Sequence, residues 1–145
     1  MKGDSSGVTL REFHYPEDYQ EVYSLWAATG PGIHLRLSDE PQEIEKKSRR
    51  DPDLFLLVEV EGSIVGTVVG GYDGRRGMMY HLAVAETHRR QGIAGMLVDE
   101  LEHRLKNKGC IRYYLLMDED NLGALAFYQH RGWEVMDLLA LAKNL

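Results

Sequence analysis

The chain has little cysteine, no long apolar run and a deficit of positive charge. Cys110 is its one cysteine, which excludes an intramolecular disulfide and a cysteine-rich metal site, so we predict a reducing, cytoplasmic location and no bound metal. No apolar run approaches the roughly 20 residues that span a bilayer, which argues against a membrane protein. With 17 basic against 23 acidic side chains, the net charge of −6 disfavours broad binding to nucleic acids or anionic membranes.

The remaining composition is that of one ordinary folded domain. Apolar residues make up 43% and charged residues 28%, which is typical of a globular protein. A length of 145 residues suits one domain and leaves no room for a second. Residues 1–7, MKGDSSG, lack the apolar core of a signal peptide. We expect them to be a disordered lead-in to a single domain over residues 8–145.

Hydrophobic periodicity divides this domain into strands and helices. Alternating or continuous apolar runs predict strands at 8–13, 53–60, 64–71, 78–85, 111–117 and 133–141. Apolar spacings of three and four residues predict helices at 16–28, 92–109 and 121–131. A further helix is predicted from Ser38 or Asp39, as the N-cap residue, to about Arg50. The resulting order predicts an α/β (α+β) fold, in which helices flank a mixed sheet. An apolar closing strand at a sheet edge would also let two copies pair as a homodimer.

The stretch HRRQGIAGM, residues 88–96, places two arginines next to a glycine-bearing turn that opens a helix. Gly92 and Gly95 let the backbone approach a partner closely, and the first N–H groups of a helix lack intrahelical acceptors. The strand before the turn, the helix and the strand at 111–117 form a βαβ crossover, whose helix start faces the strand ends. We therefore expect an anionic ligand at this turn.

The turn by itself fits several descriptions. A phosphate-binding P-loop needs Gly-Lys-Ser/Thr, which Gly92-Ile93-Ala94-Gly95 lacks. A dinucleotide fingerprint needs a glycine where Ala94 stands, and it belongs after the first strand. For an isolated match, a plain entry into a helix is the commoner outcome. The rest of the chain is needed to decide.

Two segments together resemble the signatures of the GNAT superfamily of N-acetyltransferases. Residues 89–94, RRQGIA, are similar to its acyl-CoA pyrophosphate loop, Gln/Arg-x-x-Gly-x-Gly/Ala. Residues 121–133, NLGALAFYQHRGW, are similar to its second signature, Asn-x-x-Ala-x-x-Phe-Tyr-x-x-x-Gly-Phe, with Trp133 in place of the final Phe. The likeness runs from about Val8 to Lys143. Residues 66–77, GTVVGGYDGRRG, resemble in particular the YpeA-type bacterial acetyltransferases.

The resemblance implies a mostly antiparallel sheet with a central splayed parallel pair of strands, and it implies acetyl-CoA as the cofactor. The amides of the loop would wrap the CoA pyrophosphate, which suits the positive end of a helix dipole. That loop comprises Arg89, Arg90, Gln91, Gly92, Ile93, Ala94 and Gly95. The main chain of Leu82, Ala83 and Val84 would bind the pantetheine arm. Asn121 would contact the same arm, although an asparagine there is also a good helix N-cap.

The resemblance also implies the catalytic groups. Tyr128 resembles the tyrosine that protonates the departing CoA thiolate, a role that suits a phenol protonated at pH 7. Alternatively, Tyr128 is an aromatic side chain that only packs against its neighbours. The amine would attack the thioester directly, so a base must accept its proton. His81 is our candidate, since an imidazole exchanges protons near neutral pH. The alternatives are Glu86, Asp118, Glu119 or a water.

The acceptor pocket is expected to be lined by Trp26, by His34 in the loop 30–34, and by Tyr72 and Asp73. Asp73 would attract a cationic amine, although Asp-Gly is also a common turn dipeptide. The predicted function is an acetyl-CoA-dependent N-acetyltransferase for a primary amine, on a small molecule or on a protein N-terminus or lysine. A catalytically inactive acyl-CoA-binding or sensing module and a nucleotide-phosphate binder are the alternatives.

Overall fold

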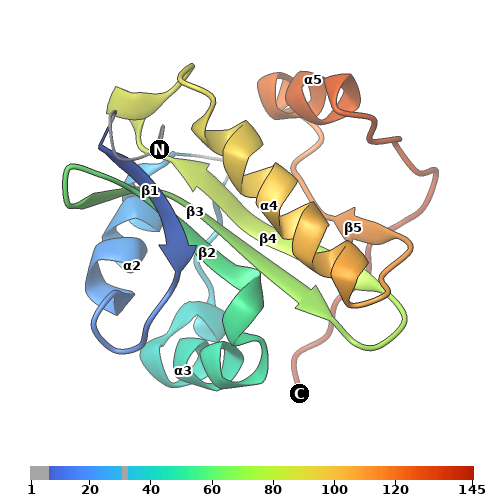
Figure 1. Ribbon diagram of the computed structural model, residues 1–145. Helices are drawn as coiled ribbons and strands as arrows, with labels where there is room; N and C mark the ends of the chain where they lie inside the picture. The colour runs from blue at the N-terminus through green and yellow to red at the C-terminus, as the bar shows by residue number, and fades with distance from the viewer. Residues whose placement is uncertain (1–6, 31–32) are drawn as a thin grey trace. The chain divides into compact units, whose positions relative to one another are not determined.

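The computed structural model describes residues 7–30 and 33–145, which form two compact units, Met1–Leu115 and Leu116–Leu145. Within these described residues the first unit contains one sheet of five strands in the order β1-β2-β3-β4-β5 (Figure 1). The strands are β1 (Val8–Glu12), β2 (Phe55–Val60), β3 (Ser63–Tyr72), β4 (Gly77–Val84) and β5 (Tyr113–Leu115). The first four pair in antiparallel fashion and β5 runs parallel to β4. The predicted mixed, mostly antiparallel sheet is therefore confirmed.

The predicted disordered lead-in lies outside the described residues, apart from Gly7. The Gly7 carbonyl accepts a hydrogen bond of 3.1 Å from the Glu61 N–H, at the turn between β2 and β3. In the described part of the chain, no helix is long and apolar enough to cross a bilayer. Nor does that part of the chain bring three His, Cys, Asp or Glu side chains together as a metal site.

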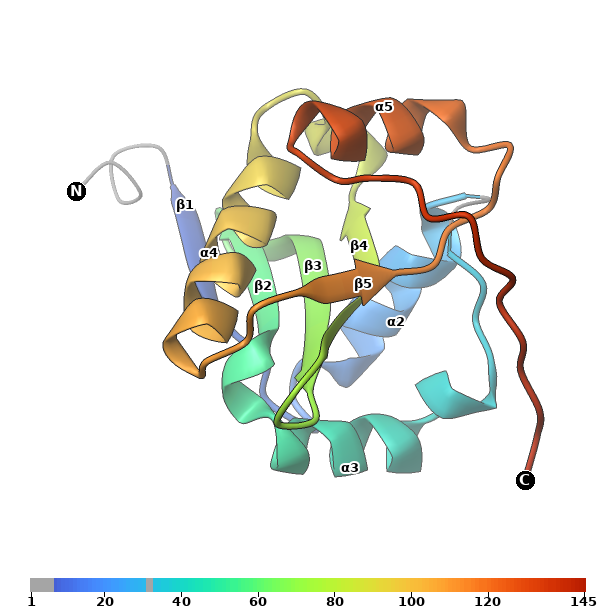
Figure 2. The same cartoon turned by 90° about the vertical axis from the view of Figure 1, so that its right-hand side faces the viewer.

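Three helices of the first unit surround the sheet. They are α2 (Tyr19–Ala28), α3 (Pro41–Arg50) and α4 (Ile93–Asn107), with single 3₁₀ turns at η1 (Leu37–Asp39), η2 (Pro52–Leu54) and η3 (Glu86–His88). Figures 1 and 2 show α4 on one face of the sheet and α2 on the other. Helix α2 begins three residues later than predicted, because the Tyr19 N–H bonds to the Pro16 carbonyl in a preceding turn. The predicted start of α3 is also early, since Asp39 belongs to η1 and Glu40 is the N-cap residue.

Helix α4 lies against β3 at two glycines. The apolar side chains that recur every four residues along it, Ile93, Leu97, Leu101 and Leu105, are almost fully buried. A Cβ atom at Gly66 would stand 2.7 Å from Ile93 Cγ2, and one at Gly70 would overlap Leu101 Cδ1. The absence of these two side chains lets the helix sit directly on the strand, which fixes where α4 begins relative to the end of β4.

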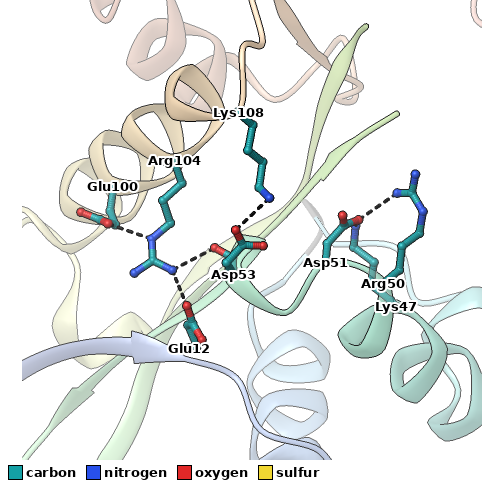
Figure 3. Close-up of polar contacts among 8 residues, drawn as sticks. All are labelled: Glu12, Lys47, Arg50, Asp51, Asp53, Glu100, Arg104 and Lys108. Atoms are coloured by element: carbon teal, nitrogen blue, oxygen red, sulfur yellow. Dashed lines mark hydrogen bonds and ion pairs between the residues drawn. The ribbon is translucent and has the colours of Figure 1, made fainter. Parts of the chain in front are cut away.

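Charged side chains hold the C-terminal half of α4 to β1 and η2 (Figure 3). The Arg104 guanidinium donates to Glu100 Oε2 at 2.8 Å, to Glu12 Oε2 at 2.6 Å and to the Asp53 carbonyl at 3.0 Å. Lys108 Nζ lies 2.9 Å from Asp53 Oδ2. The helix is thus anchored at its C-terminal end by charge and along its length by apolar packing.

The second unit contains the helix α5 (Leu122–His130), as predicted. The predicted closing strand is wrong, because the structure assigns no strand to residues 133–145. Exposed apolar side chains follow the helix instead: Val135, Leu138, Leu139 and Leu141. Apolar alternation favours a strand only where a neighbouring chain segment supplies backbone hydrogen bonds. The homodimer predicted through that strand therefore has no support in the structure.

Candidate functional site

The turn after β4 presents a helix N-terminus. Gly92 is the N-cap residue of α4, and both Arg90 (φ 63°) and Gly92 (φ 82°) adopt left-handed backbone conformations. Successive amides in such a turn point into a shared concavity that suits an anion. Helix α4 is 15 residues long and carries no acidic side chain in its first turn, so nothing there neutralises the positive end of its dipole. The prediction that this turn opens a helix is confirmed.

The two arginines of the turn have different surroundings. Arg89 Nε donates to the Val84 carbonyl at 3.2 Å, and its terminal nitrogen donates to the Thr29 carbonyl at 3.0 Å. Arg89 thus ties the ends of α2 and β4 to the turn. The exposed Arg90 side chain makes no hydrogen bond or ion pair with any residue that the structure describes. Of the two predicted phosphate contacts, Arg90 therefore has the guanidinium that is available to a ligand.

Strands β4 and β5 separate before β4 ends. They pair at three positions, from Gly77 with Tyr113 to Met79 with Leu115. Among the described residues, the rest of β4 pairs with β3 alone, and Figure 2 shows β5 running away from it. The main chain of Leu82, Ala83 and Val84 lies in this separated part, so one strand edge can bind an extended arm rich in amides. The predicted splayed parallel pair is confirmed, and it lies at the β5 edge of the sheet.

A β-bulge interrupts β4 at His81. Thr67 pairs with Ala83 and Val69 with Tyr80, so His81 and Leu82 together face one residue of β3. His81 has φ 49°, a left-handed conformation that costs a non-glycine residue about 1–3 kcal/mol. Bulges re-aim side chains, and strained backbone concentrates at functional positions. His81 is therefore a candidate functional residue on the basis of its backbone alone.

His81 contacts a nearly buried carboxylate. Its Nε2 lies 2.8 Å from Oδ1 of Asp39, a residue that is 5% exposed. Its ring packs on Trp26, with 4.7 Å between the centroids. The second Asp39 oxygen accepts the Arg36 N–H at 3.0 Å, and the Tyr19 hydroxyl donates to the Asp39 carbonyl at 2.8 Å. Sequence reasoning identified Asp39 only as a helix cap and missed this contact.

The predicted acceptor residues Trp26 and His34 differ in how far they are exposed. Trp26 is 1% exposed and donates through Nε1 to Thr67 Oγ1 at 2.9 Å, so it belongs to the core and supports the His81 ring. His34 is exposed, and the predicted loop 30–34 includes residues 31 and 32, which lie outside the described residues. The expectation that Trp26 and His34 line a pocket stays a prediction.

Tyr72 and Asp73 belong to the turn between β3 and β4. Oδ1 of Asp73 accepts the N–H groups of Arg75 and Arg76, both at 2.8 Å, and these bonds lower the pKa of the Asp73 carboxyl. The turn precedes Gly77 at the start of β4, so about 23 Å of strand separates it from the arginine turn after Val84. Asp73 therefore stabilises the turn between β3 and β4. Its contact with an amine stays a prediction.

The second unit contains the two remaining predicted residues. Asn121 Oδ1 accepts the Ala124 N–H at 3.2 Å. Asn121 is therefore the N-cap of α5, which was one of the two roles predicted for it. The Tyr128 ring packs edge-on against Phe127 and Trp133, with centroids 5.3 and 5.6 Å away. Burial raises the pKa of the Tyr128 phenol to about 12. This phenol is therefore fully protonated at neutral pH and can donate a proton.

Known proteins share both the sequence and the fold of this chain. A model of the "Acetyltransferase (GNAT) family" matches residues 19–133. Acetyltransferase ECA0875 of Pectobacterium atrosepticum is 41% identical over 130 residues, which are 89% of this chain and 90% of that protein. Ard1 from Thermoplasma volcanium has a similar structure, with a TM-score of 0.79, 27% identity, and coverage of 90% of this chain and 84% of that chain.

A more distant neighbour shares the fold alone. Naa50 of Arabidopsis thaliana, solved with the bisubstrate analogue CoA-Ac-MVNAL, has a TM-score of 0.74 at 18% identity. The match covers 90% of this chain and 85% of that chain.

Proposed function

Since this chain belongs to the acetyltransferase (GNAT) family, we propose that it moves the acetyl group of acetyl-CoA to a primary amine, on a small molecule or on a protein N-terminus or lysine. The 41% identical acetyltransferase supports the same reaction type. The observation that carries the proposal is the junction of β4 and α4. There, a strand edge that pairs with no described strand is followed, after η3 and the arginine turn, by a helix start that carries no acidic side chain.

The residues at this junction fit acetyl-CoA. The left-handed turn, the α4 N-terminus and the available Arg90 guanidinium suit a diphosphate. At 82–84 the edge of β4 that faces away from β3 pairs with no described strand, and this edge suits the pantetheine arm, which carries amide groups. When bound, acetyl-CoA supplies an acetyl group activated as a thioester. Naa50, a protein of the same fold, was solved with a CoA analogue joined to a peptide, which supports a peptide among the acceptors to be tested.

Two side chains of this chain would move the protons of the reaction. His81 would accept a proton from the acceptor ammonium, so that the free amine can form a bond to the acetyl carbon as the carbon–sulfur bond breaks. Tyr128 would give its phenolic proton to the sulfur, which is consistent with the raised pKa of that phenol, and the second proton that the nitrogen loses as the amide forms would restore the phenol. An amide N–H of β4 would polarise the carbonyl oxygen. No covalent bond to the enzyme is needed.

The proposal predicts a specific defect for Tyr128→Phe. Acetyl-CoA-dependent thiol release, measured over a panel of amines, amino acids, polyamines and short peptides, should be seen in the wild type with at least one acceptor class. The variant should lose about tenfold or more in kcat, because the thiolate loses its proton donor, while the Kd for acetyl-CoA stays within about twofold. Full turnover in Tyr128→Phe would contradict the role of the phenol.

The alternatives give different results in the same experiment. A sensing module would bind acetyl-CoA in calorimetry and release no thiol with any acceptor. A nucleotide-phosphate binder would be displaced by ATP as readily as by free CoA. The transferase should be displaced by CoA and not by ATP at equal concentration, since the pantetheine arm adds contacts along β4.

A further inference from the structure

We infer that Asp39 is a positioning residue, which fixes the orientation and tautomer of His81 so that Nδ1 receives the proton of the acceptor amine. The inference deepens the proposed function and rests on it. It assigns a role to a residue of η1 that is 42 positions away from His81 in the sequence and whose carboxylate also accepts the backbone N–H of Arg36, the N-cap residue of η1.

The contact between the two side chains determines where the ring hydrogen lies. An ionised carboxylate only accepts hydrogen bonds, so the His81 Nε2, at 2.8 Å from Asp39 Oδ1, must carry the hydrogen. In a neutral imidazole the lone pair is then on Nδ1. Nδ1 has no hydrogen-bond partner among the residues that the structure describes, and the side chain is 20% exposed. The lone pair is thus available to a molecule from outside.

Asp39 is itself held in place. Its side chain is 7% exposed, Oδ2 accepts the Arg36 N–H, and its carbonyl accepts the Tyr19 hydroxyl. In the described part of the chain, no lysine or arginine side chain pairs with this carboxylate. The imidazole is therefore the group that can provide a compensating positive charge. A proton taken up at Nδ1 converts the pair into a nearly buried ion pair, which stabilises the imidazolium.

The backbone on the other side of the ring is equally constrained. The bulge and the positive φ of His81 set the direction of the side chain, and the Trp26 ring packs against the imidazole at an interplanar angle of 58°. Thr67 Oγ1 accepts the Trp26 N–H and donates to the His81 carbonyl at 3.3 Å. Strain of this kind persists only where the surroundings over-determine it. Here both the ring and its backbone are held in one geometry.

The hydroxyl of Tyr19 in α2 bonds to Asp39, and the other ionisable groups close to this phenol are Tyr15, Tyr23, Asp39 and Glu40. Burial is the main cause of the raised pKa of Tyr19, so this phenol stays neutral over the working range of the enzyme. On the strand side, Thr67 of β3 is uncharged. A pH effect of changing Asp39 would therefore be transmitted through His81.

Asp39→Asn tests the kinetic half of the inference. The amide keeps the shape of the carboxylate and removes its charge. We expect kcat with the best acceptor to fall about tenfold or more, with the KM for acetyl-CoA unchanged. The acid limb of the pH profile of kcat/KM should move to lower pH, because the protonated ring has lost the nearby negative charge. Asp51→Asn removes an equally buried carboxylate beside Lys47 and Arg50, and should leave kcat and the profile unchanged.

Nitrogen NMR of the ¹⁵N-labelled protein tests the structural half without any turnover. His81→Gln identifies the His81 signals among the six histidines. The wild type should show the Nε2–H tautomer, and Asp39→Asn should show a changed tautomer ratio. A wild-type Nδ1–H tautomer would overturn the inference, and so would active enzyme whose kcat and pH profile are indifferent to Asp39→Asn. A wild type without turnover for any acceptor would instead count against the proposed function, and the tautomer would still decide the role of Asp39.

Discussion

At the scale of single residues, neighbours of the same type have different tasks because of what they touch. Arg89 and Arg90 are adjacent and both exposed, yet Arg89 bonds to the Thr29 and Val84 carbonyls whereas Arg90 bonds to no described residue. Sequence reasoning assigned both to the pyrophosphate. In the structure Arg89 joins two backbone carbonyls, whereas the guanidinium of Arg90 is available to an anionic ligand.

This difference leads to a paired prediction. Arg90→Ala should weaken acetyl-CoA binding about fivefold or more, the loss of about one charge-assisted hydrogen bond at an exposed position, without lowering Tm. Arg89→Ala should lower Tm by a few degrees, since two backbone carbonyls lose their donor. Calorimetry with acetyl-CoA and thermal unfolding of both variants check this. Equal effects of the two variants on both measurements would contradict the division of roles.

Asp18 illustrates how one carboxylate couples stability to pH. Both of its oxygens accept hydrogen bonds from Arg11, at 2.7 and 2.9 Å, and these bonds lower the pKa of the Asp18 carboxyl despite its burial. A depressed pKa in the folded state means that the stabilisation is present above the unfolded value of 3.8 and is lost as pH falls through the folded value.

Asp18→Asn should therefore lower the free energy of unfolding by about 1–3 kcal/mol at pH 7. The deficit should shrink as the pH falls below the unfolded pKa, since the wild-type carboxyl then becomes protonated as well. Urea unfolding at neutral and acidic pH measures it. Glu17→Gln, at the exposed neighbouring position, is the control and should match the wild type throughout. A deficit of the same size at both pH values would argue against the ion pair as its cause.

At the scale of elements, the glycines of β3 set the position of α4. Gly66 lies under Ile93, the first residue of the helix, whereas Gly70 lies under Leu101, two turns further on. A side chain at either place must displace a buried apolar group. Only at Gly66 would the displacement reach the helix start that we assign to the pyrophosphate.

Gly66→Ala and Gly70→Ala should each destabilise the protein by about 1–3 kcal/mol through overpacking. Only Gly66→Ala should also raise the Kd for acetyl-CoA, by several-fold, because it shifts the first turn of α4. Denaturant unfolding and calorimetry on both variants separate the two effects. Unchanged affinity for acetyl-CoA in Gly66→Ala, or an equal loss of affinity in Gly70→Ala, would show that the position of the first turn of α4 on β3 does not govern binding.

The sequence predicts these elements well where the signal is local. The four-residue apolar stripe of α4 and the glycine turn before it lie within one short segment, so periodicity and turn chemistry suffice. The contact between Asp39 and His81 joins positions 42 residues apart and depends on a bulge that no periodicity reveals. The closing strand at 133–141 failed because apolar alternation does not show whether a pairing partner exists.

At the scale of the whole molecule, sequence likeness and fold lead to one reaction type. The family match spans residues 19–133 and so includes both the arginine turn and Tyr128. The likeness gives the chemistry of acetyl transfer, and the junction of β4 and α4 gives a physical reason for CoA binding. The identity of the acceptor depends on the lining of its pocket, for which Trp26, His34, Tyr72 and Asp73 stay our predicted residues.

The most direct test of the central claim is to follow the acetyl carbon itself. The protein is incubated with [¹³C]acetyl-CoA and the amine and peptide panel, and the products are analysed by mass spectrometry. We predict the label in an amide on the primary amine of one acceptor class, in amounts equal to the thiol released. Label found only in free acetate, or unchanged acetyl-CoA with every acceptor despite tight binding, would contradict the account.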